Sequence, residues 1–75
     1  MVEQRTGAAG AITVNGERRE LAREMELAEL LAGLGHDPRA VAVELNGRVL
    51  KRAELPATRV RDGDRLEIVR FVQGG

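Results

Sequence analysis

One stretch of the chain has helical periodicity, and it limits the possible folds more than any other feature. Within residues 25–35, MELAELLAGLG, leucines recur at intervals of three and four residues and form one apolar stripe: Leu27, Leu30, Leu31 and Leu34. Glutamates lie near the N-terminal end of this stretch, where the helix macrodipole favours them. Gly33 or Gly35 ends the helix before Pro38. A single helix can bury its stripe only against another layer, so the remaining segments must supply one apolar face.

Two Asn-Gly pairs predict β-hairpins on either side of this helix. Asn15-Gly16 and Asn46-Gly47 each separate short segments that contain alternating apolar residues. Both residue types tolerate the positive φ that a tight hairpin turn needs, which makes Asn-Gly the strongest short signal for a hairpin. Residues 52–57 are predicted to form a short irregular or 3₁₀ connection before the last strand.

The last strand follows a turn at residues 62–64 and is predicted to have two different faces. Leu66 and Ile68 point toward the core, and the residues between and after them point away from it. Phe71 is the only aromatic residue of the sequence, and an aromatic ring left on the surface favours a role in binding. We therefore predict a partner-docking face that consists of Ala42, Glu44, Glu67, Val69 and Phe71.

The order of these elements, two strands, one helix and three strands, predicts an α+β domain. The helix stripe and the apolar sheet face cover each other, and a right-handed crossover through the helix is the common way to connect such strands. The expected fold is the β-grasp, or ubiquitin-like fold, with one mixed sheet of four to five strands packed on a single helix. We expect a disordered lead-in at residues 1–10, the β-grasp domain at residues 11–72 and a flexible tail ending in Gly-Gly at residues 73–75.

The composition argues against an enzyme with catalytic side chains of its own. The 75 residues include no cysteine, no serine and a single histidine, so we expect neither a metal site nor a bound cofactor. Twelve basic residues balance twelve acidic ones, which disfavours nucleic acid as a partner. No apolar run reaches the ~20 residues of a membrane span, and the N-terminal residues lack the apolar core of a secretory signal. The sequence therefore predicts a cytoplasmic protein, monomeric on its own and without a membrane partner.

Five segments of the chain form a specific combination: ITVNGE, LAELLAGLG, VAVELNG, VRDGDRLEIVRFV and the final GG. In this order and spacing they resemble the ThiS family, the sulfur carrier proteins of thiamin biosynthesis, and the resemblance covers residues 11–75. It implies that Gly75 carries the reactive carboxylate and that Gly74 is its companion in the tail. Because glycine has no Cβ, such a tail can pass close to the backbone of a partner in a narrow active site.

The resemblance also implies the chemistry and the partners. A ThiF-like adenylating enzyme uses ATP and magnesium to join the carboxylate of Gly75 to AMP. Sulfur from a donor such as a cysteine desulfurase then replaces AMP and leaves a C-terminal thiocarboxylate. A ThiG-like thiazole synthase takes that sulfur into the thiazole ring. Such a carrier needs no catalytic side chain, because its partner converts a poor electrophile into a mixed anhydride with a good leaving group.

Besides a plain interaction domain, which would tolerate residues added after Gly75, two other functions remain open at this point. The first is a sulfur carrier for another pathway, such as the small subunit of molybdopterin synthase. The tail of that protein more often carries prolines before the glycines, and RFVQGG has none. The second is a ubiquitin-like modifier, which would be joined to lysines of target proteins. Heavier conjugates on a denaturing gel would indicate a modifier, whereas a free protein that exchanges oxygen for sulfur would indicate a carrier.

Overall fold

The structure is a computed structural model that describes residues 10–71 of the chain. Strands dominate it, with one α-helix and two 3₁₀ segments between them. In chain order the elements are β1 (Gly10–Val14), β2 (Glu17–Leu21), β3 (Met25–Glu26), α1 (Leu27–Gly33), η1 (Pro38–Ala40), β4 (Val41–Leu45), β5 (Arg48–Val49), η2 (Arg52–Ala57), β6 (Arg59–Val60) and β7 (Arg65–Arg70).

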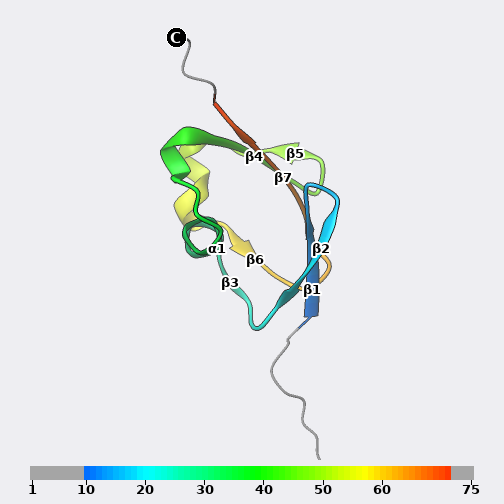
Figure 1. The fold of residues 1–75 in the computed structure, drawn as a ribbon. Coiled ribbons are helices and arrows are strands. Elements are labelled where there is room, and N and C mark those ends of the chain that lie inside the picture. Colours follow the sequence, from blue (N-terminus) through cyan, green and yellow to red (C-terminus); the bar gives the residue numbers. More distant parts are fainter. Residues whose placement is uncertain (1–9, 72–75) are drawn as a thin grey trace, which may run out of the picture.

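The main sheet has five strands in the order β2-β1-β7-β4-β5, and α1 packs on one face of it (Figure 1). The β1–β7 pair is parallel, and the other neighbouring pairs are antiparallel. The final strand therefore lies in the middle of the sheet, between the first hairpin and the second. This mixed sheet with one covering helix is the predicted β-grasp arrangement, and the predicted 3₁₀ connection is present as η2.

The core lies between α1 and the inner face of the sheet. Leu27 and Leu31 of the helix stripe are completely buried. They belong to one cluster with residues of the strands and of η2: Ile12, Val14, Leu21, Val41, Val43, Leu50, Leu55, Val60, Leu66 and Ile68. Leu30 and Leu34 are only half-buried. Three residues advance a helix by about 300°, so these two leucines lie about 60° to one side of the row that faces the sheet.

The two ends of α1 differ in how they are closed. The N–H of Gly35 donates to the carbonyl of Ala32 at 3.0 Å, and the N–H of His36 donates to that of Leu31 at 2.8 Å. With a φ of +85° at Gly35, this is a Schellman motif, so the predicted helix stop falls at this glycine. Glu26 is the N-cap, and its side chain makes no capping hydrogen bond within the described residues. None of the helices in the described part of the chain is long and apolar enough to cross a membrane.

The domain begins one residue earlier than predicted. Gly10, the last residue of the predicted lead-in, is the first residue of β1 and pairs with Leu21. A Cβ on Gly10 would lie 2.1 Å from Oδ1 of Asp62, an atom that accepts a hydrogen bond from the N–H of Ala11 at 2.9 Å. Only glycine allows this approach. The rest of the predicted lead-in, residues 1–9, and the predicted tail lie outside the described residues.

A second, two-stranded sheet is also absent from the sequence-based prediction. It pairs β3 with β6, each only two residues long, so neither segment contains enough alternating residues to reveal a strand. Beside it, the N–H of Leu27 donates to the carbonyl of Thr58 at 2.8 Å. This small sheet joins the start of α1 to the segment that leads into β7.

Candidate docking face and tail exit

The end of β7 determines where the chain continues toward Gly74 and Gly75, which lie outside the described residues. Phe71 is the last residue described, and its N–H donates to the carbonyl of Ala40 at 2.9 Å. Ala40 is the last residue of η1, directly before β4. The point at which the chain leaves the sheet is therefore positioned by η1. In Figure 1 the end of β7 and the start of β1 lie at opposite ends of the molecule.

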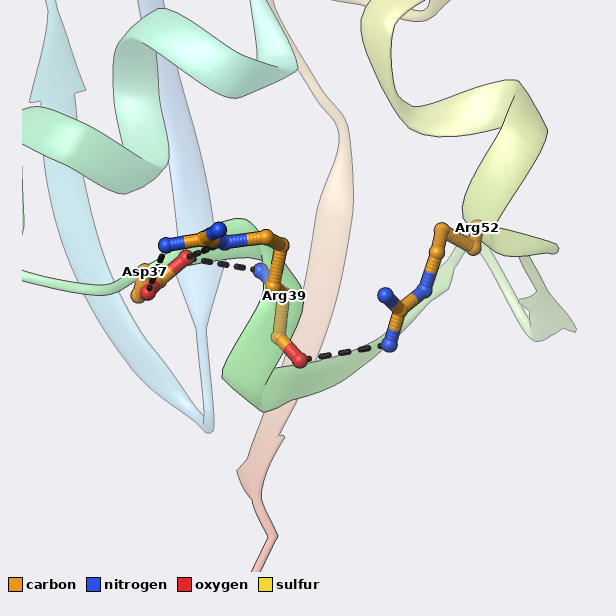
Figure 2. A network of polar contacts seen from close by, with 3 residues as sticks. All are labelled: Asp37, Arg39 and Arg52. Carbon is orange, nitrogen blue, oxygen red and sulfur yellow. Dashed lines mark hydrogen bonds and ion pairs between the residues drawn. The ribbon is translucent and has the colours of Figure 1, made fainter.

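A polar network holds η1 in place beside this exit (Figure 2). Oδ1 of Asp37 accepts hydrogen bonds from the backbone N–H of Arg39 at 2.9 Å and from its Nε at 3.3 Å. Nη2 of Arg52, from η2, donates to the carbonyl of Arg39 at 3.3 Å. The network thus joins η2 to the segment that receives Phe71. The hydrogen bonds from Arg39, first from its backbone and then from its side chain, lower the pKa of the Asp37 carboxyl.

This lowered pKa predicts a pH dependence. A carboxylate whose pKa falls on folding stabilises the folded chain above its ordinary pKa of 3.8, and the contribution disappears as the pH falls through the folded-state value. We expect the carboxyl carbon of Asp37 to titrate below 3.8 in an NMR experiment. Arg39→Gln should raise the midpoint without restoring it fully, because the backbone donor remains. A wild-type midpoint at or above 3.8 would show that the network does not form in solution.

The two Asn-Gly turns also contact β7, because their asparagine side chains form hydrogen bonds with its backbone. Asn15 and Asn46 both have positive φ, as tight hairpin turns require. The side chain of Asn15 pairs with the backbone of Ile68, accepting from its N–H at 2.7 Å and donating to its carbonyl at 3.1 Å. Oδ1 of Asn46 accepts from the N–H of Arg65 at 2.9 Å. The turn at Asn46 therefore binds the start of β7, and the turn at Asn15 binds its second half.

The structure places all five residues of the predicted docking face on the outer face of the sheet, away from α1. Ala42 lies opposite Val69 in the β4–β7 ladder, and Glu44 lies opposite Glu67. Val69 is 60% exposed, and Phe71, which follows β7, is 53% exposed. Register and exposure thus put these side chains on one face, and their role in docking remains a prediction.

Val49 belongs to the same face, although the strand pattern alone did not predict it. It is 65% exposed and lies opposite Glu44 in the β4–β5 ladder. Val49, Val69 and Phe71 are the large apolar residues exposed within residues 10–71. The hairpin geometry predicts this position, because a two-residue turn at Asn46 and Gly47 places Val49 directly across from Glu44. A shallow groove on this face is lined by Ala42, Val43, Glu44, Val49, Glu67 and Val69.

The acidic residues of the turn before β7 make backbone hydrogen bonds. Within residues 10–71, no three side chains among histidine, cysteine, aspartate and glutamate come together in a way that could hold a metal ion. Asp62 and Asp64 instead accept backbone hydrogen bonds around the turn before β7, from Ala11 and from Arg61. What the geometry presents is an apolar and acidic face next to the point where the chain leaves the sheet.

Comparisons of sequence and structure with known proteins support this fold. The ThiS family model matches residues 12–75. The sulfur carrier protein ThiS of Thermus thermophilus is 39% identical over 64 residues, which cover 85% of this chain and 98% of that protein. The crystal structure of the thiamine biosynthesis protein ThiS from Geobacter metallireducens superposes with a TM-score of 0.74 and 41% identity, covering 87% of this chain and 99% of that one.

The chain is also similar to part of a longer protein. The thiazole synthase of Paramagnetospirillum magneticum is 42% identical over 64 residues, which cover 85% of this chain and 20% of that protein. The chain spans about a fifth of the length of the two thiazole synthases that it matches. The family model, in contrast, covers nearly all of the described domain and continues through Gly75. The chain therefore belongs to the ThiS family.

Proposed function

We propose that this protein is a sulfur carrier of thiamin biosynthesis and that the carboxylate of Gly75 carries the sulfur. The observation that supports this most strongly is the family match, which runs from Ile12 through the terminal Gly74-Gly75. The ThiS relative from Thermus thermophilus is covered almost completely by the alignment, so the resemblance is not limited to one fragment of that protein. Because the chemistry consumes ATP, the proposed site of action is the cytoplasm.

The proposed reaction begins on a ThiF-like adenylating enzyme. An oxygen of the Gly75 carboxylate attacks the α-phosphate of magnesium-bound ATP, and pyrophosphate leaves. The terminal sulfur of a persulfide, supplied by a donor such as a cysteine desulfurase, then attacks the acyl carbon, and AMP leaves. A second thiol cleaves the sulfur–sulfur bond of the resulting acyl disulfide. The products are the thiocarboxylate on Gly75 and a new disulfide between donor and thiol.

In this proposal the folded domain supplies recognition, and the partners supply catalysis. The carrier delivers its sulfur to a ThiG-like thiazole synthase. The similarity to two thiazole synthases over one fifth of their length supports that choice, because in those proteins a ThiS-like segment and the remaining sequence share one chain. The outer face of the sheet is suited to docking, since Val69 and Phe71 lie directly before the residues that lead to Gly75.

Intact-mass spectrometry tests the proposed function. The purified protein is incubated with the adenylating enzyme, magnesium, ATP and a cysteine desulfurase with its substrate. We expect the free chain to gain the mass difference between sulfur and oxygen. Omission of ATP is the control and should leave the mass unchanged. Conjugates on a denaturing gel, in place of the mass shift, would instead support a ubiquitin-like modifier.

Phe71→Ala should weaken docking without affecting the fold. The ring is half-exposed and lies outside the buried cluster, so the melting temperature should be nearly unchanged. Truncation of an anchoring aromatic typically costs ~2 kcal/mol or more, which is about thirtyfold in affinity. Titration calorimetry with the adenylating enzyme and with thiazole synthase should show this loss for at least one of them.

A matched control for this variant is Arg19→Ala, on the edge strand β2 opposite Ile12. Its side chain is exposed and lies away from the docking face, so both affinities should be retained. A large fall in melting temperature for Phe71→Ala, with both affinities unaltered, would mean that the ring supports the core and that partners dock elsewhere.

A further inference from the structure

The groove on the outer face contains two carboxylates that directly oppose each other. Glu44 on β4 and Glu67 on β7 are register partners, and both point away from α1. Apolar side chains flank the pair, with Val49 across from Glu44 and Val69 next along β7. Directly opposed residues in an antiparallel pair have Cβ atoms about 4.5–5.5 Å apart, so the two negative charges repel each other.

No ion pair within residues 10–71 offsets this repulsion. The carboxylates that form ion pairs within residues 10–71 are those of Glu24, Glu29, Asp37 and Glu54. Glu44 and Glu67 form neither an ion pair nor a side-chain hydrogen bond among these residues. Like charges directly opposite each other destabilise a sheet, so the pair makes the isolated domain less stable than a neutral pair would. Its presence in an apolar groove therefore calls for a reason outside the folding of this domain.

We propose that the groove receives an apolar surface of the thiazole synthase that carries one arginine or lysine, and that this cation lies between Glu44 and Glu67. This inference rests on the proposed function, which names that partner. A purely apolar surface would bury both carboxylates unpaired, which is strongly unfavourable. A cation between them removes the repulsion and forms charge-assisted hydrogen bonds, for which the planar guanidinium of arginine is best suited.

The position of the groove supports the same occupant. Val69 lines the groove and is two residues before Phe71, the last residue described on the path to Gly75. A partner seated on Val49 and Val69 would therefore lie close to Phe71. When the partner is bound, Val49 and Val69 exclude water around the ion pair, which strengthens the attraction between the charges.

The test compares Glu44→Gln, Glu67→Gln and the double variant with the wild-type chain. Gln preserves the size of the side chain and removes its charge. The control is Glu20→Gln, which removes a carboxylate from the same face of the sheet, on β2 opposite Ala11. Two quantities are measured for each protein, namely the urea midpoint of unfolding and the affinity for purified thiazole synthase at 50 and 500 mM NaCl.

We expect the double variant to have an equal or higher urea midpoint and at least tenfold weaker binding at low salt. Wild-type affinity should fall with salt, and that of the double variant should depend on salt less steeply. Glu20→Gln should bind as the wild type does. The inference is overturned if the double variant is less stable, if it binds equally well, if Glu20→Gln loses as much affinity, or if the wild type does not bind. The mass assay for the thiocarboxylate tests the proposed function separately, since it contains no thiazole synthase.

Discussion

Removal of Gly75 is expected to abolish adenylation and to leave the domain folded. In the proposed reaction the attacking oxygen belongs to the carboxylate of this residue. In a chain that ends at Gly74, the carboxylate would stop one residue before the position at which it reacts with ATP. One residue of extended chain spans about 3.3–3.6 Å, and a displacement of that size removes the acyl group from the reactive geometry. The buried core extends only from Ile12 to Ile68, so the truncation removes none of its side chains.

ATP–pyrophosphate exchange catalysed by the adenylating enzyme measures this effect directly. Addition of one alanine after Gly75 should also abolish exchange, since the reacting carboxylate is then displaced in the other direction. A thermal melt of each variant serves as the control for folding. Undiminished exchange with the truncated chain would disprove the proposal that Gly75 is the site of sulfur attachment.

Leu31→Ala should be among the most damaging single substitutions for stability. Leu31 is fully buried and belongs to the cluster that joins α1 to the sheet. Truncation of a buried leucine costs ~2–5 kcal/mol, which is a large part of the stability of a domain this small. Urea unfolding, followed by circular dichroism, should show a clearly lower midpoint with an unchanged slope.

The matched control is Leu30→Ala, one position earlier on the same helix. Helix propensity and the change in volume are the same for both variants, but Leu30 is only half-buried. Its substitution should therefore lower the midpoint by a smaller amount. Equal midpoints for the two variants would mean that the helix is rotated relative to the sheet in solution.

Local patterns were sufficient to predict most of this fold. The helix stripe contains the two fully buried leucines of α1, Leu27 and Leu31, because helical periodicity is a property of neighbouring residues. In the same way, strand alternation correctly separated Leu66 and Ile68 from the exposed Val69 and Phe71. The Asn-Gly turns lie where predicted, since their positive φ depends on the two turn residues themselves.

The features that the sequence did not reveal depend on contacts between distant segments. The β3–β6 pair has two residues on each strand, which is too short for any periodicity. Gly10 pairs with Leu21 in β1 and lies against Asp62, and no local pattern encodes these contacts. The amides of Asn15 and Asn46 reach β7, so their second role becomes visible only with the strand order. Gly74 and Gly75 were identified by family resemblance, and their function remains a proposal.

The central place of β7 has a consequence for how the protein is made. The strand closest to the C-terminus pairs with β1 in parallel and with β4 in antiparallel orientation, so the sheet cannot close until the last strand has left the ribosome. Until then β1 and β4 have no common neighbour, and the inner face lacks Leu66 and Ile68. Contacts between such distant segments form late and slowly. A nascent or prematurely ended chain would therefore lack both the groove and the carboxylate, and a thiazole synthase that requires the two together would select folded carriers.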